Sequence, residues 1–319
     1  MMKKKVIYIR ADGGSSIGMG HIMRTMILAN ELKKKYKITY VCLDDKNNIH
    51  GIEFIKNRGF KVKVISKEED IFTIIDSIII VDKYNLNTEY YKTLETQNKV
   101  ILFDDNCTLD FYYGNIVLNQ NAYAKELKYK CNSGTKLLLG NDYTLLREEF
   151  RMKTPIEVNS DVKNIMITLG GSDDRNLTEI IIKQLIDEEF TIHIIIGQAF
   201  RHEQSLKKYE SNKVVIHKNS IISDVMKKSD ILICGCGSTI YEGLKLGLPI
   251  IGIALAENQV NLGKYLSENN IILSSDINNI KKNIVSLDYE KRCFFSNKGK
   301  SIIDGNGYKR VISEIMGIL

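Results

Sequence analysis

Residues 6–24 read VIYIRADGGSSIGMGHIMR, and this stretch decides the fold. A β-branched run from Val6 to Ile9 ends in a loop rich in glycine and serine, and an apolar pattern with helical spacing begins near Ile22. The stretch therefore predicts a strand, a loop and a helix. Glycines permit positive φ and close backbone approach, and a helix N-terminus attracts anions; the loop glycines are Gly13, Gly14, Gly18 and Gly20.

The loop leaves three interpretations open: a nucleotide-sugar site, another phosphate or carboxylate site, or a purely structural glycine loop. His21 stands at the start of the predicted helix, where the dipole favours the neutral imidazole that a general base needs. The alternative is a loop histidine with satisfied hydrogen bonds. Counting from Gly18, Met23 stands where a dinucleotide fingerprint has its third glycine, which disfavours a dehydrogenase.

Composition indicates a globular protein of about two domains. The 319 residues carry a net charge of +6, and the lysines are spread along the chain, which argues against a nucleic-acid face. The six cysteines lack the spacing of zinc ligands, so we expect reduced thiols and no metal or cofactor. We expect no membrane insertion, because no apolar stretch is long enough, and no obligate protein partner; the cytoplasm is the default location.

The chain alternates predicted strands and helices in two series, which indicates an α/β protein with two Rossmann-like, doubly wound domains facing each other across a cleft. We place the domains at residues 1–152 and 153–319, with a polar linker around Pro155. The last apolar pattern predicts a terminal helix, 302–319. Expected strands are Val6–Ile9, Ile38–Cys42, Lys61–Val64, Ile78–Val81, Val100–Phe103 and Ile116–Leu118, then Ile165–Leu169, Thr191–Ile196, Val214–Ile216, Ile231–Cys234 and Ile250–Ile253.

Polar residues follow several strands of the first series, including Asp82-Lys83-Tyr84 and Asp104-Asp105-Asn106. In parallel sheets, ligands gather at these carboxyl ends. Expected helices of this half lie near Ile22–Lys35, Ile52–Arg58, Ile71–Ile75 and Glu89–Gln97.

The second half contains a loop, Gly235-Cys236-Gly237, that leads into another predicted helix. Ser238, Thr239 and the helix N–H groups are suited to a diphosphate, and Glu242, one turn later, to two ribose hydroxyls. The alternative is a capping arrangement with Ser238 as N-cap. Further on, Asn258 and Gln259 offer amides to sugar hydroxyl or acetamido groups, or simply begin a polar helix.

Several strings occur in a fixed order: Gly18-Met-Gly-His-Ile-Met-Arg24 with Arg10, Asp12 and Ser15-Ser16 before it, Phe103-Asp104-Asp105, Leu118–Ala124, Leu146–Phe150, Leu169–Asp173 and Glu257-Asn258-Gln259. Together they resemble PseG, the family that hydrolyses UDP-2,4-diacetamido-2,4,6-trideoxy-β-L-altropyranose in the pseudaminic acid pathway. That family is built like the MurG branch of the GT-B glycosyltransferases. In MurG-like proteins the terminal helix often leans back onto the first domain, so the resemblance implies that the final helix, 302–319, packs there.

The resemblance implies that His21 is the general base and that Tyr84 lines the same cleft. It also implies a UDP-sugar substrate and water attack at the anomeric carbon, with inversion. Ser238, Thr239 and Glu242 match its diphosphate and ribose positions, and Asn258 and Gln259 its sugar-side pair. Lys83 departs from the Asp-His-Tyr usual in the family. Asp12 or Asp105 could orient His21, or could cap loops instead.

Two other functions remain open on the sequence. A MurG-like inverting transferase would use the same UDP site and deliver the sugar to an acceptor hydroxyl. A non-catalytic nucleotide-sugar binding protein would bind UDP at Ser238–Glu242 without releasing it and would not need His21.

Overall fold

The computed structural model describes residues 5–14, 17–171, 173–197, 200–218 and 220–318. Ser15, Ser16 and Ser172, which belong to the strings quoted above, lie outside these ranges. The chain forms two compact units: Met1–Leu145 together with Asn306–Leu319, and Leu146–Gly305.

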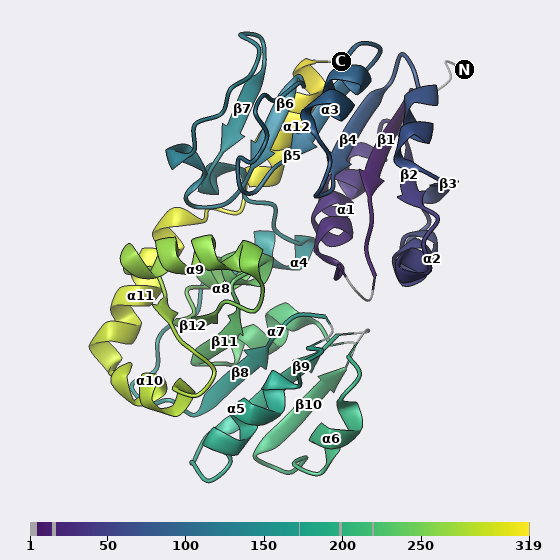
Figure 1. Ribbon diagram of the computed structural model, residues 1–319. Helices are drawn as coiled ribbons and strands as arrows, with labels where there is room; N and C mark the ends of the chain where they lie inside the picture. Colours follow the sequence, from purple (N-terminus) through teal and green to yellow (C-terminus); the bar gives the residue numbers. More distant parts are fainter. Residues whose placement is uncertain (1–4, 15–16, 172, 198–199, 219, 319) are drawn as a thin grey trace. The chain divides into compact units, whose positions relative to one another are not determined.

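The first unit contains a seven-stranded parallel sheet in the order β3-β2-β1-β4-β5-β6-β7 (Figure 1). Its strands are β1 Val6–Ala11, β2 Lys37–Leu43, β3 Lys61–Ile65, β4 Ile78–Asp82, β5 Lys99–Phe103, β6 Ile116–Asn119 and β7 Lys136–Leu139. The order reverses at β1 and β4, so the carboxyl ends of these two neighbours form the switch point at which doubly wound sheets bind ligands.

Helices cover both faces of this sheet. They are α1 Gly20–Leu32, α2 Ile49–Asn57, α3 Thr88–Glu95 and α12 Gly307–Gly317, with 3₁₀ turns at Lys46–Asn48, Glu68–Thr73, Ala124–Glu126 and Asn141–Tyr143. Val311 and Ile315 of α12 are fully buried in the same core as Ile27 and Leu28 of α1. The last helix, yellow in Figure 1, is thus part of the first unit.

The second unit contains a six-stranded parallel sheet in the order β10-β9-β8-β11-β12-β13. The strands are β8 Asn164–Thr168, β9 Thr191–Ile196, β10 Val214–Lys218, β11 Ile231–Gly235, β12 Ile250–Ile253 and β13 Leu273–Ser274. The helices are α4 Glu148–Arg151, α5 Leu177–Leu185, α6 Glu203–Lys207, α7 Ile222–Lys227, α8 Ser238–Leu246, α9 Glu257–Glu268, α10 Ile280–Ser286 and α11 Tyr289–Ile302. Two parallel-sheet α/β units confirm the predicted fold class.

Three local expectations differ from the structure. The helix expected near Ile71–Ile75 is a 3₁₀ segment, Glu68–Thr73, because Asp70 accepts from the N–H groups of Ser66 and Lys67 and holds a tight turn. Strands β7 and β13 were not predicted. The expected final helix is broken: α11 ends at Ile302 and α12 begins at Gly307, with Gly305 between them at a φ of +83°.

Among the described residues, no helix combines the length and the apolar character that crossing a bilayer requires.

Candidate functional site

Strand alternation places two carboxylates beside helix α1. Ile78 and Ile80 of β4 lie in the core that α1 covers, whereas Ile79 and Val81 lie in the core of the opposite face. Because side chains alternate along a strand, Asp82 points to the α1 side. The same alternation holds on β5, where Ile101 and Phe103 face α1 and Asp105 follows with the same parity. Both carboxylates therefore meet the first turn of α1.

His21 lies in that first turn, with its side chain 11% exposed. Its Nδ1 atom is 2.6 Å from Oδ1 of Asp82, which is almost fully buried. An ionised carboxylate only accepts hydrogen bonds, so Nδ1 carries the proton and donates to Asp82. In the neutral ring, Nε2 is then left with its lone pair. This is the geometry of a histidine base oriented by a carboxylate.

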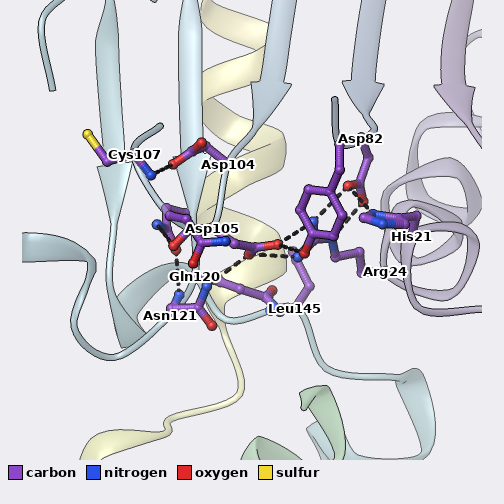
Figure 2. Close-up of polar contacts among 12 residues, drawn as sticks. His21, Arg24, Asp82, Asp104, Asp105, Cys107, Gln120, Asn121 and Leu145 are labelled. Carbon is purple, nitrogen blue, oxygen red and sulfur yellow. Dashed lines mark hydrogen bonds and ion pairs between the residues drawn. The ribbon is translucent and has the colours of Figure 1, made fainter. Parts of the chain in front are cut away.

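Arg24 lies one turn after His21 on the same face of α1 and contacts both carboxylates. Its Nε and Nη2 atoms donate to Asp82 at 2.6 and 2.7 Å, and its Nη1 and Nη2 atoms donate to Asp105 at 2.9 and 3.0 Å. Burial would raise the pKa of the Asp82 carboxyl, but Arg24 and His21 hold that pKa well below its usual range. Figure 2 shows Arg24 between the two carboxylates.

Tyr84 completes the cluster and contacts both Asp105 and His21. Its hydroxyl lies 2.5 Å from Oδ2 of Asp105, and its ring meets the imidazole edge-on, with centroids 4.6 Å apart. The side chain is about two-fifths exposed. Burial would raise the pKa of Asp105, but Arg24 and the Tyr84 hydrogen bond lower it. The structure thus brings together His21 and Tyr84, the two residues for which the resemblance implied a place in the same cleft.

The string Asn119–Tyr123 holds Asp105 in place. Asn121 donates to the Asp105 carboxylate at 2.8 Å, while Asn119 and Tyr123 donate to its backbone carbonyl. Gln120 accepts from the backbone N–H of Leu145 (Figure 2). Three buried residues of this string, Asn119, Asn121 and Tyr123, therefore fix the loop after β5.

The proposed orienting role of Asp12 or Asp105 needs correction, since the partner of His21 is Asp82. Asp12 follows β1 with the parity of Arg10, on the sheet face opposite α1, because Ile7 and Ile9 lie in the α1 core. There Asp12 makes two bonds to Arg10, at 2.7 and 2.6 Å, and one to Lys83 at 2.9 Å. Asp105 acts on the cluster through Arg24 and Tyr84.

The four loop glycines divide into two pairs. A Cβ on Gly14 would lie 1.7 Å from the carbonyl oxygen of Asn47, and one on Gly13 would lie 2.5 Å from Ile22, so this pair is required for packing. Gly18 and Gly20 have no neighbour within 4 Å of such an atom, and Gly18 has a φ of +72°. Space is therefore left beside the backbone of Gly18 and Gly20, the latter next to His21 in the chain.

In the second unit, α8 begins directly after the loop Gly235–Gly237. The N-cap is Gly237, so the capping alternative with Ser238 as N-cap is wrong. Ser238 is exposed and Thr239 is partly exposed at the first turn of the helix. The helix N-terminus and the two hydroxyls thus remain accessible to an anion.

Glu242 differs from the expected open ribose acceptor. Its carboxylate is 7% exposed and makes a two-pronged pair with Arg147, in which both bonds are 2.6 Å long. Burial raises the pKa of the Glu242 carboxyl, and Arg147 offsets only part of that rise. Glu149, two residues after Arg147, accepts from the backbone N–H of Ser223. The string Leu146–Phe150 therefore attaches the start of the second unit to α8 and α7.

Asn258 and Gln259 lie in the first turn of α9. Asn258 is exposed, whereas Gln259 accepts from the backbone N–H of Leu255 at 3.0 Å. Gly235 and Gly237 lie next to the Gln259 amide, which would be within 3.7 Å of a Cβ on either glycine. The structure therefore brings Gln259 to the loop that begins α8.

Sequence reasoning missed Asp82, Arg24 and Arg147 as members of these clusters. The parity of Ile78, Ile80 and Asp82 was a usable signal for the first, and the spacing of His21 and Arg24 for the second. Arg147 gave no local signal, because its partner Glu242 is 95 positions away.

Comparisons with known proteins find relatives by sequence and neighbours by fold. A family model described as "Protein of unknown function (DUF354)" matches residues 163–315. An uncharacterised protein of Methanocaldococcus jannaschii is 32% identical over 92% of this chain, which spans 64% of that relative's length. The UDP-2,4-diacetamido-2,4,6-trideoxy-β-L-altropyranose hydrolase of Campylobacter jejuni is 29% identical, over 83% of this chain and 96% of the relative.

Among solved structures, MurG of Acinetobacter baumannii superimposes with a TM-score of 0.69 at 13% identity, over 98% of this chain and 99% of MurG. This likeness shows the GT-B fold. By sequence the chain is similar to the Campylobacter jejuni hydrolase, and by fold it is similar to MurG.

Proposed function

We propose that this protein is an enzyme that hydrolyses a UDP-linked 2,4-diacetamido-2,4,6-trideoxy sugar and releases UDP. The similarity to the Campylobacter jejuni hydrolase supports this substrate class, and the His21–Asp82 pair supports the chemistry. Water attacks the anomeric carbon, a C–O bond to water forms with inversion, and the C–O bond to UDP breaks. The water proton passes to Nε2 of His21.

The first unit supplies the residues that we assign to the water. With Nδ1 held by Asp82, the imidazole has Nε2 as its acceptor, and general-base catalysis of this kind is worth about 10²–10⁴ in rate. The exposed ring of Tyr84 forms a wall beside the imidazole, and its hydroxyl is fixed by Asp105. Gly18 and Gly20 leave room for a sugar close to the backbone.

The second unit supplies the residues that we assign to UDP. The α8 N-terminus, Ser238 and Thr239 stabilise the departing diphosphate. Each oxygen of Glu242 accepts one bond from Arg147 and keeps a further acceptor site for a ribose hydroxyl. Asn258 and Gln259 are assigned to the sugar. The pathway we propose is pseudaminic acid biosynthesis.

The observation that carries the proposal is the contact between His21 and the buried Asp82. The test is UDP release from the UDP-diacetamido sugar without any acceptor. We expect turnover by the unchanged protein and a fall of at least about 10²-fold in the His21→Leu variant, with UDP affinity retained. His50→Gln, a change of another helix-borne histidine, is the matched control and should keep full activity.

Near-normal turnover by His21→Leu would overturn the assignment of the base. UDP release that begins only when an acceptor alcohol is added would instead identify a transferase. UDP binding without any release would identify a binding protein.

A further inference from the structure

The first unit contains a buried group of charges that the proposed chemistry does not by itself require. Asp82 and Asp105 are 1% and 8% exposed and follow neighbouring strands, and the guanidinium of Arg24 lies between them. With a neutral His21, the three side chains carry a net charge of −1. Without Arg24 the same buried space would hold two carboxylates and no cation.

We propose that Arg24 is a positioning residue whose guanidinium keeps Asp82 and Asp105 ionised and so fixes the orientation of both His21 and Tyr84. This inference rests on the proposed function for its kinetic consequences, and its structural consequence is measurable without substrate.

The geometry requires an arginine. The four bonds from Arg24 leave from three nitrogen atoms of one plane and reach two carboxylates, at distances of 2.6–3.0 Å. A lysine ammonium is a single point and cannot make two two-pronged contacts. The guanidinium carbon also lies 5.0 Å from the centre of the Phe103 ring, which fixes the plane of the fork.

Each carboxylate, held by Arg24, in turn fixes the orientation of one candidate site residue. Asp82 accepts from Nδ1 of His21, which selects the tautomer with a free Nε2. Asp105 accepts from the Tyr84 hydroxyl, which stops rotation of a side chain that is otherwise partly exposed. If one carboxylate took up a proton, it would stop acting as a pure acceptor.

Two carboxylates in one buried site take up a first proton at a higher pH than a single isolated carboxylate does, because protonation removes the repulsion between them. The charged and titratable side chains near the two carboxylates are His21 and Arg24 from α1, Tyr84 after β4, Asp104 beside Asp105, and the two carboxylates themselves. The phenols of Tyr40, Tyr91 and Tyr123 also lie near them and are neutral at physiological pH, because burial raises their pKa values. Arg24 is thus the cation that balances this group.

The experiment compares Arg24→Met and Arg24→Lys with the unchanged protein. In Arg24→Met we expect kcat to fall about 10²-fold, with KM within about threefold of that of the unchanged protein, since the variant misplaces His21 and Tyr84. The acid limb of the pH profile of kcat/KM should move up by about one to three pH units. Arg24→Lys should keep the acid limb near its original position and recover only part of kcat.

A double variant, Arg24→Met with Asp105→Asn, separates charge from packing. It removes one negative charge together with the cation, so its acid limb should return toward that of the unchanged protein. A limb that stays where Arg24→Met places it would overturn the proposal, as would an unshifted limb in Arg24→Met itself.

Nitrogen-15 NMR of the His21 side chain gives a reading that does not depend on turnover. We expect the Nδ1–H tautomer in the unchanged protein and a mixture of tautomers in Arg24→Met, with His21→Leu used to assign the signal. If no UDP sugar is hydrolysed but the tautomer changes, the proposed function fails and this inference stands. If hydrolysis occurs and neither the tautomer nor the acid limb changes, this inference fails.

Discussion

Nδ1 of His21 lies 2.6 Å from Oδ1 of Asp82, although the two residues are 61 positions apart in the chain. One comes from the first turn of α1 and the other from the end of β4, the two elements that meet at the switch point of the sheet. The contact leaves one specific nitrogen, Nε2, to act on a substrate.

The Asp82→Asn variant tests that contact. An amide can offer its N–H₂ group to Nδ1, which favours the wrong tautomer, so we expect kcat to fall by about 10³- to 10⁴-fold with little change in UDP affinity. Steady-state kinetics and UDP titration measure the two quantities. Asp110→Asn, at an exposed carboxylate, is the control, and equal activity of both variants would contradict the role of Asp82.

The variants Gly20→Ala and Gly18→Ala distinguish a steric clash with the substrate from strain in the backbone. A Cβ at Gly20 meets no protein atom, so the free energy of unfolding should stay the same or rise by up to about 1 kcal/mol. If a sugar approaches this backbone, kcat/KM should nevertheless fall at least about tenfold. At Gly18, where φ is +72°, alanine should cost about 1–2 kcal/mol of stability. Urea unfolding and kinetics on both variants distinguish the two effects.

Arg147→Met tests the buried pair of the second unit. Removing the cation leaves Glu242 uncompensated, and we expect the free energy of unfolding to fall by about 3 kcal/mol. The double variant Arg147→Met with Glu242→Leu should recover most of that loss, because no buried charge remains. Denaturant unfolding of the single and double variants measures the coupling, and simple additivity of the two changes would refute it.

His193 and His217 predict a pH dependence of stability. Nδ1 of His193 lies 3.0 Å from Nε2 of His217, and burial lowers the pKa values of both below the ordinary 6.5. The unfolded chain therefore binds more protons, so their contribution to stability is present above pH 6.5 and is lost as the pH falls through the lower folded values.

The free energy of unfolding should accordingly fall between pH 7.5 and pH 5, and less steeply in His193→Gln. Urea unfolding at a series of pH values measures this, and His50→Gln serves as the control. An equal slope in both variants would show that other groups cause the pH dependence.

Much of this architecture could be predicted from local patterns. The β-branched runs located eleven of the described strands closely enough to indicate two parallel sheets, because a buried parallel strand is apolar on both faces. The loop before α1 and the position of His21 at its start could also be predicted from neighbouring residues in the sequence. Short elements such as β13, two residues long, carry no pattern that sequence reasoning can detect.

The partners of the site residues depended on contacts between distant segments. Glu242 was assigned to ribose from the sequence, and that assignment stays a proposal. The sequence did not reveal that Arg147 pairs with its carboxylate, since a buried carboxylate needs a cation. Asp12 was one of two residues that the sequence offered to orient His21, but the alternation of β1 turns it to the other face of the sheet. The sequence thus indicated the candidate site residues, whereas their contacts with distant residues required the structure.

The most direct test of the central claim is hydrolysis in ¹⁸O-labelled water, with the UDP-diacetamido sugar and no acceptor. We predict ¹⁸O at C1 of the free sugar and none in UDP, because water attacks carbon. Label in the β-phosphate of UDP would contradict it, because that label requires attack at phosphorus.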